Sequence, residues 1–215
     1  MLIACWSAKG GAGTTVVAAA LALVTGRSHP GGALLADLAG DAAAVLGLPE
    51  PDGPGLAGWL AAGPDVPADA LGRLEVPAHP DLGLLPRGHG PLDAARADVL
   101  AALLRADRRA VVADCGADPA GTALAVAAAA TRSILVTRPC FLALRRAQHA
   151  SIRPSEVVLV TEPGRALSRR DVEDCVGAPV VAEVALDPAI ARAVDAGLLL
   201  ARLPRGLARD LARAA

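Results

Sequence analysis

The chain has 215 residues, of which 53% are hydrophobic and 20% are charged. This length suits one domain with a sizeable core, and the apolar content excludes disorder for most of the chain. With 21 basic and 22 acidic side chains the net charge is -1, which excludes strong polyanion binding by the whole surface.

Short runs of Val, Leu, Ile and Ala recur along the chain and predict buried strands. Stretches with helical spacing separate most of these runs. Residues 77–81 are expected to form a turn between two short strands. The expected strands are Leu2–Ser7, Ala33–Leu38, Arg73–Val76, Leu82–Leu85, Ala110–Asp114, Ser133–Thr137, Val157–Thr161 and Val180–Val184.

The segments between the strands predict helices. They are Thr14–Thr25, Leu56–Ala62, Leu92–Arg105, Thr122–Ala130, a helix from Leu142, Arg169–Val176, Pro188–Ala196 and Leu207–Ala214. The alternation predicts an α/β fold, namely a single doubly wound, mostly parallel sheet with helices on both faces, spanning residues 1–215 as one domain. Because ligands of such folds bind at the carboxyl ends of the strands, the residues just after each strand are the candidates for chemistry.

Cysteine spacing and apolar runs indicate the compartment. Cys5, Cys115, Cys140 and Cys175 are far apart and form no C-x-x-C pair, so we expect small apolar residues in a reducing cytoplasm. No uncharged apolar stretch reaches the ~18 residues that a membrane span needs, so membrane insertion is not expected.

The first expected strand runs into a glycine-rich loop. A turn of this kind between a strand and a helix points backbone N–H groups into one concavity, and the helix N-terminus adds partial positive charge. It predicts a phosphate cradle with a hydroxyl at the Mg²⁺ position; the alternative is a flexible turn with an incidental lysine. The second alternative does not explain why the only lysine of the chain lies in this loop, when arginine is used everywhere else. The loop reads Ser7, Ala8, Lys9, Gly10, Gly11, Ala12, Gly13, Thr14, Thr15.

This loop resembles the deviant Walker A motif of the ParA/MinD family of SIMIBI-class P-loop ATPases. Lys9 matches the signature lysine, which in the family reaches across a dimer to the phosphate of the partner. The resemblance implies that Gly10–Thr15 binds ATP, with Thr15 on Mg²⁺. Thr14 stands where the family has a second lysine on the β- and γ-phosphates.

Two further segments resemble motifs of the same family. Asp37 matches the first aspartate of an Asp-x-Asp motif, which implies that it helps orient the attacking water. Ala39 occupies the second position, and a displaced Asp41 is the alternative there. Asp114 ends a segment that resembles Walker B, which implies that it holds Mg²⁺ through water; a helix cap is the alternative role. The N–H of Gly116 would then face the γ-phosphate.

The resemblance implies a Rossmann-like, three-layer P-loop NTPase that forms a homodimer on nucleotide binding. Such proteins position a chromosome, a division site or a pilus. The resemblance also implies a partner protein, which the sequence does not identify. Hydrolysis is expected to be slow or absent because Thr14 and Ala39 are neutral. Thr161 occupies the place of an adenine-reading Asn. One alternative is a non-hydrolysing scaffold of the TadZ/CpaE pilus-localising kind, and another is a metabolic enzyme that transfers phosphate.

The surface predictions concern the C-terminal segment and one arginine pair. Leu203, Leu207 and Leu211 recur every four residues and predict a terminal helix packed on the domain rather than on a membrane. The C-terminal arginines and Arg145-Arg146 predict, at most, weak and sequence-independent DNA binding. The resemblance implies a cytoplasmic protein that associates with the nucleoid or a cell pole.

Overall fold

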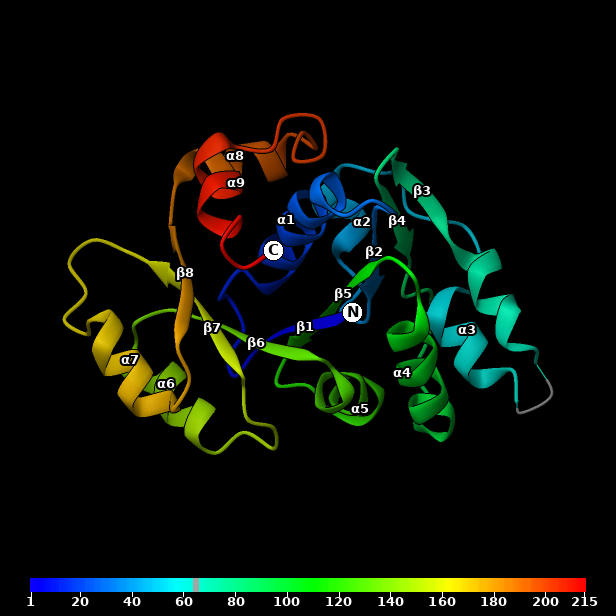
Figure 1. Cartoon of the computed structure of the whole chain (residues 1–215), viewed down its shortest axis with the longest axis horizontal. Coiled ribbons are helices and arrows are strands. Elements are labelled where there is room, and N and C mark those ends of the chain that lie inside the picture. The colour runs from blue at the N-terminus through cyan, green and yellow to red at the C-terminus, as the bar shows by residue number, and fades with distance from the viewer. Residues whose placement is uncertain (64–65) are drawn as a thin grey trace.

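A single sheet lies between two layers of helices (Figure 1). The structure is a computed structural model and describes residues 1–63 and 66–215. The strand order is β3-β4-β2-β5-β1-β6-β7-β8, and neighbouring strands are parallel except for β3 and β4. This topology confirms the predicted fold class. The strands are β1 (Leu2–Ser7), β2 (Ala33–Asp37), β3 (Val76–His79), β4 (Leu82–Leu85), β5 (Ala110–Ala117), β6 (Arg132–Thr137), β7 (Glu156–Thr161) and β8 (Val180–Ala185).

Alternate residues of the central strands supply two hydrophobic cores, because successive side chains of a strand point to opposite faces of the sheet. Leu2, Ala4 and Trp6 of β1 belong to one core, whereas Ile3 and Cys5 belong to the other. All six residues of β1 are buried. Burial on both faces is the reason that the central strands are continuous apolar runs.

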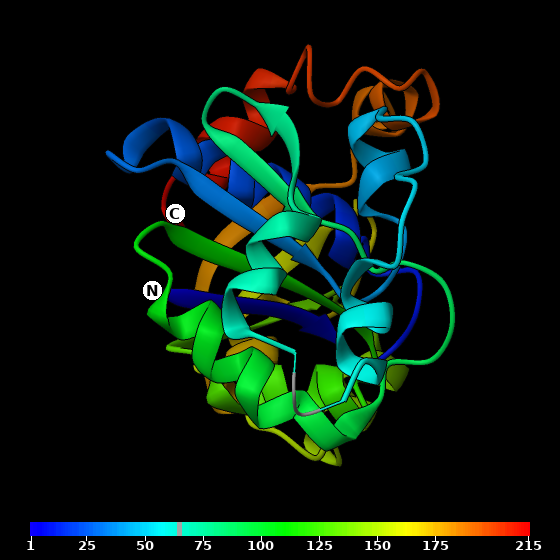
Figure 2. The same ribbon diagram turned by 90° about the vertical axis from the view of Figure 1, so that its right-hand side faces the viewer.

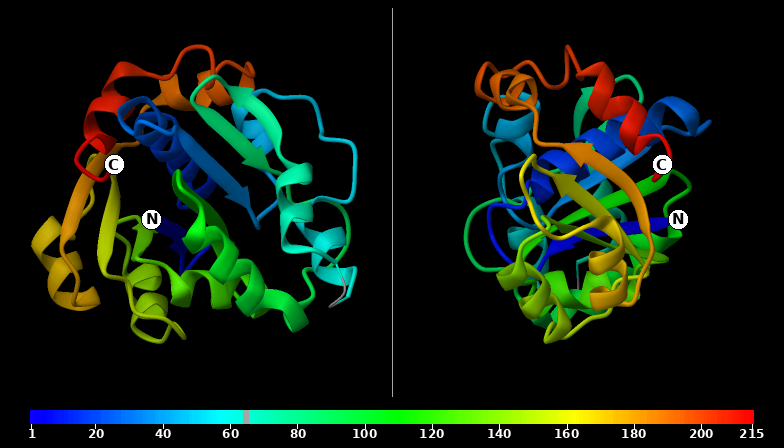
Figure 3. Two further views of the ribbon diagram at one scale, coloured as in Figure 1. Left: turned by 45° about the vertical axis from the view of Figure 1, so that its right-hand side comes forward. Right: turned by 90° about the vertical axis from the view of Figure 1, so that its left-hand side faces the viewer.

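Each core is closed by its own layer of helices, seen from the side in Figure 2. One layer contains α1 (Thr14–Ser28), α2 (Ala42–Leu46), α8 (Pro188–Asp195) and α9 (Arg205–Leu211). The other contains α3 (Gly55–Ala61), α4 (Ala97–Ala106), α5 (Gly121–Ala129), α6 (Phe141–Gln148) and α7 (Arg169–Val176), with the 3-10 helices η1 (Ala68–Leu74) and η2 (Ala94–Arg96). The edge strands β3 and β8 lie at opposite ends of the sheet (Figure 3).

Two local predictions were wrong. The sequence did not predict α2, which has only five residues. The strand expected at Arg73–Val76 begins only at Val76, because the preceding residues form the end of η1. β3 therefore occupies most of the segment expected to be a turn. It includes Pro77, which an edge strand tolerates although proline has no N–H for a ladder bond.

The carboxyl ends of β1, β2 and β5 meet at one edge of the sheet, because β5 lies between the other two strands. Asp37 at the end of β2 pairs in register with Asp114 of β5, and Cys5 of β1 pairs with Asp114 on the other side. The loops that follow these strands therefore surround one space. Among the helices of the described residues, none combines the length and apolarity needed to cross a bilayer.

Candidate functional site

The loop between β1 and α1 forms an open turn at the sheet edge. Gly11 and Gly13 adopt φ angles of 79° and 85°, in a left-handed region that residues with a Cβ rarely adopt. Gly13 is the N-cap of α1; its carbonyl accepts the N–H of Val17 at 2.9 Å, and no side chain caps this end. The N–H groups of the first turn lack helical partners, so the loop and the helix dipole together favour an anion.

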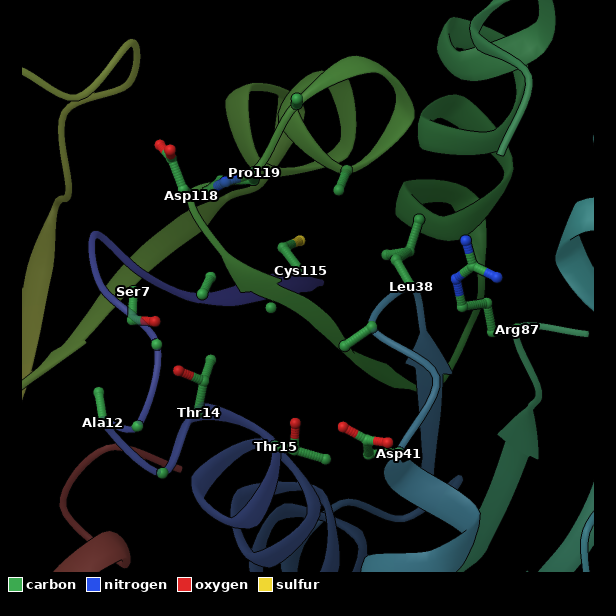
Figure 4. A pocket seen from close by; sticks show the side chains of 18 of the residues that line it. Ser7, Ala12, Thr14, Thr15, Leu38, Asp41, Arg87, Cys115, Asp118 and Pro119 are labelled. Atoms are coloured by element: carbon green, nitrogen blue, oxygen red, sulfur yellow. The ribbon is translucent and has the colours of Figure 1, made fainter. Parts of the chain in front are cut away.

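A cavity of about 760 Å³ opens above this loop (Figure 4). This volume is within the usual range for small-molecule sites, about 300–1,000 Å³. Three further chain segments complete its wall. The lining residues are Ser7, Gly10–Val16, Leu38, Ala39, Asp41, Arg87, Pro91, Leu92, Cys115–Ala120 and Ala123. The Oγ atom of Ser7 is buried and finds no hydrogen-bond partner among the described residues.

Asp114 immediately precedes Cys115, which lines this cavity; Asp114 itself does not line it and is fully buried. Its Oδ1 accepts the N–H of Gly116 at 3.1 Å, whereas its Oδ2 has no hydrogen-bond partner in the described part of the chain. Burial raises the pKa of Asp114 to about 6, against the lowering effects of the nearby Thr15 hydroxyl and of the Gly116 N–H. The bond from Gly116 also means that its N–H is directed at Asp114, not at the cavity as the resemblance implied.

An unpartnered carboxylate oxygen near a threonine hydroxyl fits a hard cation such as Mg²⁺. Within residues 1–63 and 66–215, no cluster of three or more His, Cys, Asp or Glu side chains could hold a metal by itself. Mg²⁺ commonly takes only one or two protein ligands and completes its octahedron with waters and substrate phosphates. Thr15 and Asp114 are therefore a sufficient protein contribution.

Asp37 is held by its own loop. Its Oδ1 accepts the N–H groups of Ala39 at 3.1 Å and Gly40 at 2.6 Å, and its Oδ2 accepts that of Ala42 at 3.0 Å. Burial raises the pKa of Asp37, and these three N–H groups oppose that rise. Like Asp114, Asp37 is not among the residues that line the cavity; its carboxylate fixes the loop after β2 through these three bonds.

Asp41 supplies the exposed carboxylate that Asp37 does not. It precedes α2, and its side chain makes no capping bond to that helix. Asp41 and Ala39 both line the cavity, and Figure 4 shows Asp41 on the same wall as Thr15. The alternative assignment of the missing second carboxylate to Asp41 thus has a geometric basis.

Lys9 does not line the main cavity. It is half-buried and borders a separate, smaller cavity of about 90 Å³ together with Arg138, Cys140 and Arg165. The loop residues Gly10 and Ala12 form the wall that the two cavities share. Lys9 therefore contributes to a different cavity from the one above its own loop.

A third cavity, of about 290 Å³ and mainly apolar, adjoins the loop on the side of β7 and β8. Gly11–Gly13, Val160, Val184 and Ile190 contribute to its wall. Thr161 does not; its hydroxyl donates to the carbonyl of Val184 at 3.4 Å.

Arg138 and the segment from Ala185 to Asp187 do line the apolar cavity, although no role was predicted for them. The position of Ala185–Asp187 directly after the strand expected at Val180–Val184 was the available signal, because ligands of such folds bind at strand ends. It marked this segment without identifying a binding role for it.

The two arginine groups do not form one patch. Arg145 and Arg146 are exposed on α6, whereas the C-terminal arginines lie on and beside α9 in the opposite layer. Leu207 and Leu211 are buried in the core that contains α1, which confirms that the terminal helix packs on the protein. Any nucleic-acid surface would therefore use one arginine group alone.

Comparison with known proteins gives a clear result only at the level of structure. No family model matches the chain, and no curated protein matches it either. Solved structures of ParA and MinD proteins share its fold.

A ParA family ATPase from Chlorobium tepidum TLS has a TM-score of 0.79 and 19% identity, covering 98% of this chain and 96% of that one. The septum site-determining protein MinD of Pyrococcus horikoshii OT3, complexed with Mg-ADP, has a TM-score of 0.79 and 20% identity, covering 99% and 93%. The MinC:MinD cell division protein complex of Aquifex aeolicus has a TM-score of 0.81 and 18% identity, covering 99% of this chain and 93% of that one. The predicted resemblance is therefore confirmed for the fold, over essentially the whole chain.

Proposed function

We propose that this protein is an ATP-binding switch of the ParA/MinD kind, which dimerises and helps to position a cellular structure. One observation carries the proposal: the unpartnered Oδ2 of Asp114 and the hydroxyl of Thr15 lie together where the glycine loop opens onto a nucleotide-sized cavity. A purely structural loop has no need of a buried, unpartnered carboxylate oxygen. The similarity to a MinD structure that contains Mg-ADP supports the same ligand.

In this proposal the backbone N–H groups of Gly10–Thr15 bind the phosphates, helped by the N-terminus of α1. Thr15 and Asp114 hold Mg²⁺, which when bound neutralises charge on the phosphate oxygens. Ser7 has a free hydroxyl on the cavity wall for a further hydrogen bond. The apolar cavity beside Gly11–Gly13 accepts the base.

The position of Lys9 supports the proposed dimer. Because this lysine borders a different cavity from its own phosphate loop, it is available to the nucleotide of a second subunit. The second subunit also explains why a lone lysine is retained in a chain whose other cations are arginines. A partner protein, still to be identified, would recognise the nucleotide-bound dimer.

Hydrolysis is proposed to be slow, because positioned charge supplies most of the catalysis in phosphoryl transfer. Thr14 and Ala39 are neutral, and Asp37 is bonded to its own loop. The same observations favour the second candidate, a non-hydrolysing scaffold of the pilus-localising kind. The two candidates differ in whether nucleotide binds at all.

Titration calorimetry with ATP and ADP, each with and without Mg²⁺, tests the proposal. We expect Mg²⁺-dependent binding by the wild type and weaker binding by Thr15→Ala, with an unchanged melting temperature. Ser151→Ala, which removes an exposed hydroxyl at a residue that lines none of the cavities described above, serves as the control. Absence of binding at millimolar nucleotide would refute the switch and leave the scaffold. Turnover as fast as that of a fully equipped family member would refute slow hydrolysis.

A further inference from the structure

Arg87 is the one positively charged side chain that lines the main cavity within the described residues. The other ionisable residues on its wall are acidic or weakly acidic: Asp41, Asp118 and Cys115. Arg87 is half-buried and follows β4, across the cavity from Thr14 (Figure 4). No role was predicted for it from the sequence.

The guanidinium of Arg87 is held in place without being neutralised. Its Nη1 donates to the carbonyl oxygens of Gly88 at 3.3 Å and Gly90 at 2.9 Å, both in its own loop. A guanidinium has five N–H donors in a fixed plane. The donors on Nε and Nη2 therefore remain for a ligand, and the positive charge is not cancelled by a carboxylate in these contacts.

The loop that carries Arg87 is fixed to the body of the protein. The carbonyls of Pro86 and Arg87 accept the N–H groups of Leu56 at 2.9 Å and Ala57 at 2.8 Å, at the start of α3. The approach is close: a Cβ added at Gly88, where φ is +70°, would lie 2.1 Å from the carbonyl oxygen of Pro54. The arginine stem also lies against the loop after β2, because a Cβ at Gly40 would be 3.1 Å from its Cδ.

We propose that Arg87 binds the terminal phosphate of a nucleoside triphosphate, supplying from the same subunit the positive charge that Thr14 lacks. This inference rests on the proposed function, since it requires nucleotide phosphates on the Gly10–Thr15 loop. A phosphate chain anchored on that loop extends across the cavity, and the wall opposite carries the planar donors that suit phosphate oxygens. Arg87 is thus a residue that discriminates a triphosphate from a diphosphate.

The experiment measures the affinities of a non-hydrolysable ATP analogue and of ADP, both with Mg²⁺, for the wild type and variants. Loss of a charge-assisted hydrogen bond predicts that Arg87→Ala binds the triphosphate about 10–100-fold more weakly. Its affinity for ADP should stay within about twofold of the wild type, on the same reasoning. Arg153→Ala is the control, because Arg153 also donates to a carbonyl, that of Gln148 at 2.9 Å, but does not line this cavity.

Arg87→Gln retains an amide donor for the loop carbonyls and keeps the test valid if Arg87→Ala does not fold. An equal loss for ATP analogue and ADP, or no loss for either, overturns the inference while nucleotide binding itself stands. A wild type that binds neither nucleotide overturns the inference and the proposed function together.

Discussion

Replacement of Asp114 by Asn would measure how much the buried carboxylate destabilises the ligand-free protein. The carboxylate is fully buried, and one of its two oxygens has no partner among the described residues. Burial raises its pKa from 3.8 to about 6, and the neighbouring Asp37 and Asp41 act in the same direction. At neutral pH the ligand-free protein therefore holds a buried charge that the Gly116 N–H and the Thr15 hydroxyl compensate only in part. Asparagine has nearly the same shape and removes that charge.

The magnitude follows from the difference between the two pKa values. About two pH units at 1.36 kcal/mol each correspond to roughly 3 kcal/mol of lost stability when Asp114 is ionised. The asparagine N–H₂ group would be incompletely hydrogen-bonded, which costs about 1 kcal/mol. We therefore expect Asp114→Asn to raise the free energy of unfolding at pH 7.5 by about 2 kcal/mol, or the melting temperature by about 4–8 °C.

The sign of the pH dependence distinguishes this explanation from a packing effect. The pKa of Asp114 is higher in the folded state than in the unfolded chain, so the folded state binds the proton more tightly. Ionisation consequently destabilises the fold as pH rises from about 4, and this effect is complete above about 6. The gain in Asp114→Asn should therefore be about 1 kcal/mol smaller at pH 5 than at pH 7.5, by the same linkage.

Urea unfolding followed by circular dichroism at the two pH values provides the measurement. Asp52→Asn, at an exposed loop position, is the control for loss of one negative charge. The variant should also lose Mg²⁺-dependent nucleotide binding while it gains stability. A destabilised variant at pH 7.5, or a gain that is the same at both pH values, would refute the reasoning.

Three further predictions concern groups around the site. Asp37→Ala should lower the free energy of unfolding by about 2–4 kcal/mol, because it leaves three backbone N–H groups without an acceptor; an unchanged urea midpoint would contradict this. Cys140 should be alkylated by a maleimide before Cys5 and Cys115. Lys9 and the N–H groups at the start of α6 lower the pKa of Cys140, whereas burial raises the pKa of the other two thiols. Peptide mass mapping of the labelled sites gives the order. Lys9→Ala should abolish ATP-dependent dimerisation with little change in melting temperature, and Lys9→Arg should restore it only in part; light scattering that finds an intact Lys9→Ala dimer would exclude a role in trans.

The fold was largely predictable because burial on both faces forces each central strand to be a continuous apolar run. Such runs identify β1, β2 and β5–β8 without knowledge of their partners. Residues 66–81 were less predictable, because the edge strand β3 is only partly buried and its sequence shows no regular alternation of apolar and polar residues. α2 was missed for a related reason: five residues provide too short a pattern to establish helical spacing.

The candidate site was only partly predictable. The β1–α1 loop and the position of Asp114 on β5 depend on local sequence and could therefore be predicted from it. The role of Asp37 depends on the path of the loop after β2, which brings three N–H groups back onto its carboxylate.

Strand alternation accounts for the absence of Thr161 from the wall of the apolar cavity. Val158 and Val160 face the core that contains α1 and α8, so Thr161 belongs to the opposite set of alternating residues, with Val157 and Leu159. Arg87 could not have been found from sequence, because its position depends on contacts between two loops.

The pattern of retained and lost charges favours a bound nucleotide over an empty scaffold. A scaffold requires the sheet, its cores and a dimer face, and none of these requires an ionised side chain at position 114. A neutral residue of similar size there would make the ligand-free fold more stable, since an uncompensated buried charge destabilises a protein. Residues kept at such a cost are usually functional, because binding sites are optimised for their ligand and not for the stability of the free protein. Asp114 and the uncancelled guanidinium of Arg87 are complementary to Mg²⁺ and to phosphate respectively; Arg87 lines the main cavity, and Asp114 immediately precedes Cys115, which also lines it. Thr14 and Ala39, by contrast, remove charges that would serve the chemical step. Under the proposed function, the charge distribution thus separates binding from turnover: the groups proposed to hold Mg²⁺ and a triphosphate are charged, whereas positions 14 and 39, which would serve hydrolysis, are neutral.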